Sequence, residues 1–513
     1  MASLSPPPLS PAVLTRRSAL LSAGALALAS SVRANPAPRD VTALEATALS
    51  AAIHARQVSC IEVMTAYLDR IDRQNRAVNA IVALQPRDGL LKQAQACDED
   101  LAAGRSRGWM HGFPHAVKDL ENTKGIVSTQ GSPIFRDFVP THDSFFVERL
   151  RKSGAILIGK TNAPEFGLGS QTYNPVYGAT LNAYDHRKTS GGSSGGASVG
   201  VALRMLPVAD GSDYMGSLRN PSGWNNIFGL RPTVGRVARV QDSFLPSMGV
   251  MGPLARTVPD LAMLLSVMSG YDARDPASLR DDPQIFTRPL VSDVKGLRLA
   301  WLGDYNGYLS FEPGVLELCQ KAIATLERMG CIVTPVVPDF PMKQLWDAFV
   351  TIRAWQNCVG MIDLYNDPAK RALLKPEAIW EIERGRTLTA LDVSRASAVR
   401  DAWYRTVVDL FQSHDFLLSP RAQVFPFDAT LHWPDHINGR AMDTYHRWME
   451  VSAPITMTAC PALNVPVGFG PNGLPMGMQI VGRHAADLSC LQLGHAYDQA
   501  TQWVTRYPPK AVA

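Results

Sequence analysis

Apolar residues in the first third of the chain recur in helix-length and strand-length segments. Residues 42–75 have the spacing of two helices, and Ser59 and Glu62 form a capping box at the start of the second. Ile61, Met64, Leu68 and Ile71 then fall on one face of that helix. Short apolar runs at 77–84, 113–117 and 155–158 predict strands, and residues 143–153 predict a helix.

The same alternation continues after a polar, glycine-rich stretch at residues 185–196. An apolar stretch at 199–208 and a tight loop at 210–217 come next. Helices then alternate with strands through 257–270, 297–302, 313–330 and 331–337. Residues 340–450 are rich in Trp, Tyr and Arg and predict a mostly helical, substrate-facing region. Residues 461–483 alternate short strands with Gly and Pro turns. This order predicts an α/β fold with helices covering a sheet, and residues 35–513 as a single domain.

The N-terminus has the features of an export signal. Arg16 and Arg17 precede a short apolar run at residues 19–29, and Ala34 ends a small-residue pattern typical of cleavage. Residues 1–34 are therefore predicted to be a twin-arginine-type signal peptide that directs the protein to the periplasm. An uncleaved anchor is the alternative, but the apolar run is too short to span a bilayer.

Composition indicates a globular protein and adds little about partners. The 513 residues are 46% hydrophobic and 19% charged, which excludes a disordered chain. The formal net charge is +4, and the predicted signal carries Arg16, Arg17, Arg33 and no acid, so the remainder has a net charge of about +1. We therefore expect no nucleic-acid partner and no stable membrane span. The seven cysteines are scattered without a C-x-x-C pair, so mostly buried free thiols with at most one or two disulfides are expected.

The glycine-rich stretch Gly191–Gly196 allows several interpretations. A flexible linker is disfavoured because apolar segments flank it on both sides. Gly191-x-Ser193-x-Gly195 fits the nucleophile elbow of serine hydrolases, but that motif requires a strand directly before it, and residues 184–188 are polar. A phosphate-binding loop would need a trailing Gly-Lys-Ser/Thr, which is missing.

Several further motifs, taken in order, decide between these interpretations. The chain contains HAVKD at 115–119, GKTNAPEFG at 159–167, SGGSSGG at 190–196, GSDYMGSLRNP at 211–221, GLRP at 229–232, GPLART at 252–257 and GLPMGMQ at 473–479. In this order and spacing the sequence resembles the amidase signature family. The resemblance covers most of residues 42–500. It implies a three-layer α/β/α fold with a large, twisted, mixed central sheet.

The resemblance also implies a Ser–Ser–Lys triad. Ser217 corresponds to the nucleophile, Ser193 to the bridging serine in a cis peptide, and Lys118 to the base. The separations of 24 residues between the serines and 75 between Lys118 and Ser193 match the family and select Ser193 over Ser194. The chemistry is reasonable, because a serine must lose its proton as it attacks an amide. A desolvated lysine can accept that proton near neutral pH.

The resemblance assigns the oxyanion hole to the backbone N–H groups of Tyr214, Met215, Gly216 and Ser217. Relatives usually have glycine where this chain has Met215. Asp213 is expected to brace the loop, and Arg219 to be a structural ion-pair partner. Gly192 and Ser194 are expected to support the site.

We therefore predict an exported amidase that cleaves linear carboxylic amides to an acid plus ammonia or an amine, through an acyl-enzyme on Ser217. No cofactor and no metal are predicted, because no His/Cys/carboxylate cluster has metal-ligand spacing. The partner would be a small amide, and the protein a monomer or homodimer. Export argues against a role on tRNA. The alternative is a periplasmic binding protein that keeps the fold without catalysis, supported only by Met215.

Overall fold

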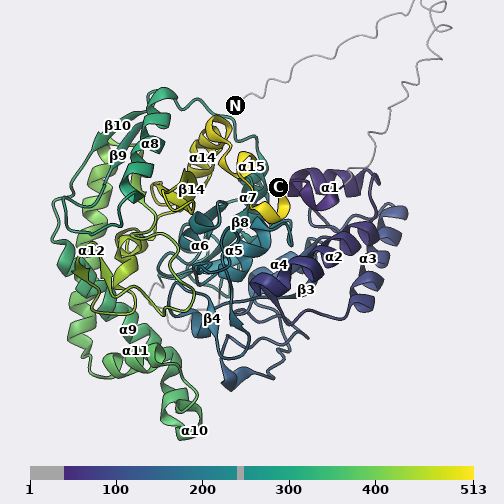
Figure 1. The fold of residues 1–513 in the computed structure, drawn as a ribbon, viewed down its shortest axis with the longest axis horizontal. Helices are drawn as coiled ribbons and strands as arrows, with labels where there is room; N and C mark the ends of the chain where they lie inside the picture. The colour runs from purple at the N-terminus through teal and green to yellow at the C-terminus, as the bar shows by residue number, and fades with distance from the viewer. Residues whose placement is uncertain (1–39, 240–247) are drawn as a thin grey trace, which may run out of the picture. The chain divides into compact units, whose positions relative to one another are not determined.

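The computed structural model describes residues 40–239 and 248–513. The predicted export signal lies outside these ranges, and the described residues group into one compact unit. Figure 1 shows helices on both sides of a twisted central sheet. The fold is mixed α/β, as the alternation of elements predicts.

The central sheet has eight strands in the order β10-β9-β11-β15-β14-β7-β8-β6. The pairs β10–β9 and β9–β11 are parallel, and the others are antiparallel. The strands are β6 (Ala209–Asp213), β7 (Phe228–Arg231), β8 (Val250–Ala255), β9 (Arg298–Trp301), β10 (Ile332–Pro335), β11 (Phe416–Pro420), β14 (Ala462–Phe469) and β15 (Pro475–Val481). Strand pairs far apart in sequence therefore bring residues 209–231 and 416–481 together.

A smaller sheet adjoins the β6 edge. It has the order β1-β3-β2, with β1 (Ile81–Val82) antiparallel to β3 (Ile156–Thr161) and β3 parallel to β2 (Pro114–Lys118). Strand β2 lies beside β6, because the backbone N–H of Lys118 donates to the Asp210 carboxylate at 3.2 Å. This contact places the end of β2 next to the loop that follows β6. The isolated hairpins are β4 (Tyr173–Asn174) with β5 (Gly178–Ala179) and β12 (His436–Ile437) with β13 (Arg440–Ala441).

Strand β14 shows how helices cover both faces of the sheet. Leu463 and Val465 pack against Gly494 of α14 (Asp487–Thr501), whereas Asn464 packs against Gly223 of α6 (Arg219–Trp224). Successive side chains of a strand point to opposite faces, so α14 and α6 lie on opposite faces. Helices α7 (Val258–Met268) and α8 (Val315–Arg328) contact α14, and α5 (Gly195–Ala202) contacts α6.

The remaining helices form the periphery. The N-terminal helices are α1 (Ala46–His54), α2 (Cys60–Val78), α3 (Arg87–Ala102) and α4 (Phe145–Lys152). Of these, α2 and α3 pack together. On the other side of Figure 1, α9 (Met342–Asn366) packs against α11 (Pro376–Arg386) and α12 (Ala390–Ser413). The short helices are α10 (Pro368–Arg371), α13 (Ala453–Thr456) and α15 (Trp503–Arg506), with 3₁₀ turns at Val41–Ala43, Pro133–Phe135, Glu165–Gly167, Pro283–Thr287, Arg447–Ser452 and Lys510–Val512.

Several sequence predictions need correction. The strand expected over 77–84 is only Ile81–Val82, because α2 continues to Val78. The loop expected over 210–217 begins as strand β6, and the apolar stretch at 199–208, to which no element was assigned, begins inside helix α5. Such short apolar runs cannot be assigned by periodicity alone.

Helix α2 shows one correction and one confirmed detail. The Ser59–Glu62 capping box is present, with the Ser59 N–H donating to the Glu62 carboxylate at 2.8 Å. Ile61, expected on the apolar face, is 37% exposed, and Cys60, Val63 and Tyr67 are buried instead. All seven cysteines are buried free thiols.

Candidate active site

Lys118 ends strand β2 with its side chain completely buried. Its ammonium nitrogen lies 2.8 Å from Ser193 Oγ, 2.8 Å from Ser194 Oγ and 2.9 Å from Ser212 Oγ. Among the residues that the structure describes, no carboxylate forms an ion pair with it. The lysine is therefore surrounded by hydroxyl groups that can exchange protons with it.

Burial controls the protonation of Lys118. Removal from water penalises the charged ammonium and lowers its pKa to about 7, although the carboxylates of Asp210, Asp213 and Glu121 oppose this effect. An ordinary lysine is almost fully protonated at neutral pH. Lys118 instead has a substantial neutral fraction there, which a general base requires.

A second buried lysine provides a useful contrast. Lys160 Nζ donates to Thr123 Oγ1 at 2.9 Å and to Ser128 Oγ at 3.1 Å. Burial lowers its pKa only to about 8, because Asp119 and other carboxylates oppose the effect. Its partners brace the segment that follows β2, so the contacts of Lys160 are those of a structural residue.

Ser193 lies in the glycine-rich stretch, which is a tightly packed turn. The Gly192–Ser193 peptide is cis, as the family resemblance implies. The Gly192 carbonyl accepts a hydrogen bond from Ser170 Oγ at 2.6 Å. A Cβ atom at Gly196 would lie 2.4 Å from the Asn162 nitrogen, so no larger residue fits there without a shift. The linker interpretation is therefore wrong, and the glycines permit close packing.

Ser217 lies between strand β6 and helix α6. Its backbone carbonyl accepts a hydrogen bond from the Ser194 N–H at 3.2 Å, which fixes the two loops relative to each other. Within the described residues its hydroxyl makes no hydrogen bond, and the residue is 8% exposed. Ser193 and Ser217 both line a cavity of about 610 Å³. No hydrogen bond joins the hydroxyl groups of these two described residues, so the bridging role of Ser193 between Ser217 and Lys118 stays a prediction.

The expected oxyanion donors differ in their availability. The Gly216 N–H donates to the Asp213 carboxylate at 2.8 Å, so it is engaged by the protein. The N–H groups of Tyr214, Met215 and Ser217 have no hydrogen-bond acceptor among the described residues. Three of the four predicted donors are therefore available, and Gly216 instead helps to hold the loop.

Met215 fits the loop without disturbing the cavity. Its side chain is 3% exposed and packs in the hydrophobic core, and its φ is not in the left-handed region. The positive φ of the loop falls on Gly216, at 91°. The replacement of the usual glycine by Met215 is thus accommodated by packing.

Asp213 connects the loop to two buried arginines. It forms buried ion pairs with Arg219 at 2.9 Å and Arg231 at 3.4 Å. The two guanidinium groups and the Gly216 N–H hold the pKa of Asp213 well below its ordinary value, despite burial. Arg219 also donates to Thr456 Oγ1 at 3.0 Å, so its contacts are with the protein and match the predicted structural role.

Several residues that contact the predicted site were not found by sequence reasoning, and Ser212 and Gln356 are two of them. Ser212 contacts Lys118, although its position on β6 gave no signal in the sequence. Gln356, on α9, accepts a hydrogen bond from the Tyr214 hydroxyl at 2.5 Å. The ring of Tyr214 also lies under the guanidinium of Arg353, 5.1 Å from its centroid. These contacts connect the helical region 340–450 to the nucleophile loop.

His115 lies behind the site and not in it. Its Nε2 lies 2.9 Å from the Asp210 carboxylate, and both side chains are completely buried. Asp210 also accepts the backbone N–H of Lys118. His115 therefore supports the position of β2, as expected for a strand residue near the site.

The cavity beside Ser217 is lined by polar residues and by an apolar patch. Leu120, Phe135 and Phe166 line it from the segments after β2 and β3, and Met361 and Leu364 from α9. Phe135 and Phe166 meet edge to face, with ring centroids 6.4 Å apart. Polar groups are added by residues such as Glu121, Gln130, Arg239, Gln356 and Asn357. Helix α9 thus contributes to the cavity, as the predicted substrate-facing role of region 340–450 requires.

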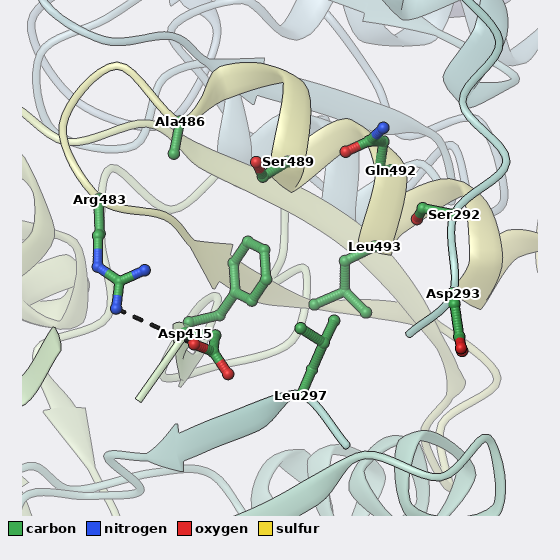
Figure 2. Close-up of a pocket in the computed structure, with 10 residues that line it drawn as sticks. Ser292, Asp293, Leu297, Asp415, Arg483, Ala486, Ser489, Gln492 and Leu493 are labelled. Carbon is green, nitrogen blue, oxygen red and sulfur yellow. Dashed lines mark ion pairs between the residues drawn. The ribbon is translucent and has the colours of Figure 1, made fainter. Parts of the chain in front are cut away.

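A second cavity, of about 260 Å³, lies elsewhere and lacks the triad. Figure 2 shows Leu297 and Leu493 pointing into it, with Arg483 and Asp415 at one end. The Arg483 guanidinium forms an ion pair with the Asp415 carboxylate at 4.0 Å. Across residues 40–239 and 248–513, no three metal-ligating side chains cluster, and no helix has the length and apolarity to cross a membrane.

The fold agrees with comparisons to known proteins. Residues 62–491 match the family model described as Amidase. The chain is 32% identical over 477 residues to an acylamidase of Rhodococcus erythropolis, covering 91% of this chain and 97% of the relative. It is 33% identical over 488 residues to a subunit of the glutamyl-tRNA(Gln) amidotransferase of Chloroflexus aurantiacus, covering 91% of this chain and 98% of the relative.

Solved structures give the same result. A bacterial aryl acylamidase described as an amidase signature enzyme superposes with a TM-score of 0.83 at 28% identity, covering 90% of this chain and 97% of that one. These comparisons identify a hydrolase of the amidase type. The chain belongs to the amidase signature family.

Proposed function

We propose that this protein hydrolyses carboxylic amides through an acyl-enzyme on Ser217, with Lys118 as the base and Ser193 as the relay. The observation that carries the proposal is the buried Lys118, 2.8 Å from Ser193 Oγ, beside a cavity that both serines line. A lysine kept neutral among hydroxyl groups is an arrangement suited to activating a serine.

The proposed reaction has two halves. Ser217 Oγ attacks the amide carbonyl carbon while its proton passes through Ser193 to Lys118. The C–N bond then breaks, and Lys118 returns a proton through Ser193 to the leaving nitrogen. Water attacks the acyl-enzyme in the same way, releases the acid and restores Ser217. The free N–H groups of the loop after β6 stabilise the oxyanion in both halves.

The apolar patch in the cavity lining supports amides that carry an aromatic or other apolar group. Phe135 and Phe166 present ring surfaces to the space beside Ser217. Burial of such a group in place of water favours binding. Two of the similar proteins are named acylamidase and aryl acylamidase. We therefore propose anilides as better substrates than short aliphatic amides.

A fluorophosphonate probe tests the nucleophile. The wild-type protein should be labelled at Ser217 and should hydrolyse an anilide, and Ser217→Ala should do neither. Ser193→Ala should keep weak activity, because Ser193 relays a proton and does not attack. Ser198→Ala is the matched control. The buried Ser198 hydroxyl donates to the Pro221 carbonyl at 2.7 Å and has no other partner among the described residues, so its loss should leave labelling unchanged.

Two results would contradict the proposal. Labelling that persists in Ser217→Ala would assign the nucleophile to another residue. A wild-type protein that is folded, unlabelled and inactive on every amide of a panel, yet binds one of them, would be the binding protein considered above.

We also propose that residues 1–34 direct export to the periplasm by the twin-arginine route. The paired Arg16 and Arg17 before a short apolar run support this. Fractionation of cells that express the full chain tests it. The wild-type protein should appear in the periplasm, and a variant with Arg16→Lys and Arg17→Lys should stay in the cytoplasm. Equal distribution of the two proteins would refute the proposal.

A further inference from the structure

An unusual buried charge lies behind the nucleophile loop. Three completely buried arginines, Arg219, Arg231 and Arg421, surround the single carboxylate of Asp213. Arg219 and Arg231 form ion pairs with it. Arg421, which follows strand β11, has no ion pair among the described residues. The cluster therefore holds an excess of buried positive charge next to the loop where the reaction would generate negative charge.

The contacts of Arg421 are with neutral groups. One guanidinium nitrogen donates to Ser452 Oγ at 2.8 Å and another to the Gly216 carbonyl at 3.1 Å, while Nε has no partner. A neutral amide side chain makes such bonds at a lower desolvation cost than a buried cation. A role in tethering the loop does not by itself explain why this residue carries a buried charge. The position of the Arg421 guanidinium relative to the loop therefore needs an explanation.

The Gly216 carbonyl belongs to the same peptide unit as the Ser217 N–H. In a trans peptide these two groups point in opposite directions. The Gly216 carbonyl accepts hydrogen bonds from the Asn220 N–H at 2.6 Å and from Arg421, and together these bonds direct the Ser217 N–H away from the arginine cluster. That N–H has no acceptor among the described residues, and Ser217 lines the cavity. Donation to a carbonyl also polarises the peptide and strengthens its N–H as a donor.

The loop is shaped around this arginine. Gly216 has a φ of 91°, and a Cβ atom there would lie 2.4 Å from the guanidinium of Arg421 and 2.8 Å from Ser452 Oγ. The N–H of Gly216 is fixed on its other side by Asp213. Glycine thus allows Arg421 to approach the backbone directly. Of the two peptide units that flank Gly216, one is held by Asp213 through its N–H and the other by Arg421 through its carbonyl.

We propose that Arg421 is a positioning residue for the oxyanion hole: it orients and polarises the Gly216–Ser217 peptide so that the Ser217 N–H donates to the oxyanion. The inference rests on the proposed amide hydrolysis at Ser217. Arg421 does not touch substrate. Its effect is largest in the transition state, when the carbonyl oxygen carries negative charge.

Kinetics of Arg421→Met and Arg421→Lys on an anilide test this role. Loss of an oxyanion donor typically lowers kcat by about 10²–10³-fold. Arg421→Met should lower kcat by about 10- to 100-fold, since the N–H remains but is less well directed, and should leave KM within about threefold. Arg421→Lys, which keeps the charge, should recover part of the loss. Arg236→Met, a buried arginine paired with Asp487 at 3.1 Å, is the control and should keep the wild-type kcat.

Inhibition by phenylboronic acid separates positioning from simple loss of structure. Its tetrahedral adduct on a serine carries negative charge, so its Ki should rise in Arg421→Met by about the same factor as kcat falls. Ser452→Ala, which removes one acceptor but leaves the guanidinium, should lower kcat by a smaller factor and remains informative if Arg421→Met does not fold.

The outcomes are distinct. If Arg421→Met has a kcat within threefold of wild type, or an unchanged Ki for the boronic acid, the inference about Arg421 is overturned and the proposed amide hydrolysis is unaffected. If Arg421→Met does not fold, a Ser452→Ala variant with wild-type kcat and Ki would overturn it. A wild-type protein without labelling or turnover would overturn the proposed function first.

Discussion

The lowered pKa of Lys118 predicts a pH dependence of both the free energy of unfolding and the catalytic activity. In the folded protein the pKa of Lys118 is about 7, whereas an unfolded lysine keeps its proton to about pH 10. Between these values the unfolded chain binds more protons, so the free energy of unfolding rises with pH. The buried lysine therefore destabilises the protein at neutral pH, and this penalty disappears as the solution becomes alkaline.

The magnitude follows from this difference in pKa. One proton bound only by the unfolded state changes the free energy of unfolding by about 1.4 kcal/mol per pH unit. At pH 7 the folded lysine is about half protonated, and by pH 9 it is neutral. The gain from pH 7 to 9 is therefore about 2 kcal/mol. Lys118→Met has no such proton and lacks this gain.

Urea unfolding of wild type and Lys118→Met at pH 7 and pH 9 measures the effect. Other groups titrate in both proteins, so the difference between the two pH dependences isolates Lys118. Lys152→Met is the control, because that lysine is exposed, and it should follow wild type. In wild type, kcat/KM should fall about tenfold per pH unit well below pH 7. Parallel pH dependences of wild type and Lys118→Met would show that the folded lysine is charged and refute its role as base.

Three further predictions test the surroundings of the site. Asp210→Asn should move the acid limb of kcat/KM to lower pH, because the carboxylate raises the pKa of Lys118; an unmoved limb would show that the charge has no effect there. Gly196→Ala should destabilise the protein by more than about 1 kcal/mol, because its Cβ would meet backbone at 2.4 Å, whereas Gly89→Ala, with open space in α3, should be neutral or stabilising in urea unfolding. Tyr214→Phe should lower the free energy of unfolding by about 1 kcal/mol and reduce kcat/KM several-fold; wild-type kinetics would show that α9 does not position the loop.

The amino-acid sequence alone determined the alternation of elements and the order of the motifs. Helix α2 and its capping box follow from local spacing, because a helix start depends on residues three positions apart. The residues Lys118, Ser193 and Ser217 could be selected from their spacing and from the resemblance to a family. Their types are required by the chemistry, and that information is local to each motif.

The tertiary structure alone decided which distant residues complete the site. Ser212 contacts Lys118 because β2 lies beside β6, and Gln356 reaches Tyr214 because α9 packs near the nucleophile loop. Arg421 reaches Gly216 across 205 residues of chain. Such contacts depend on how sheets and helices pack, and no periodicity along one segment encodes them. The pKa of Lys118 likewise depends on burial, which is a property of the assembled core.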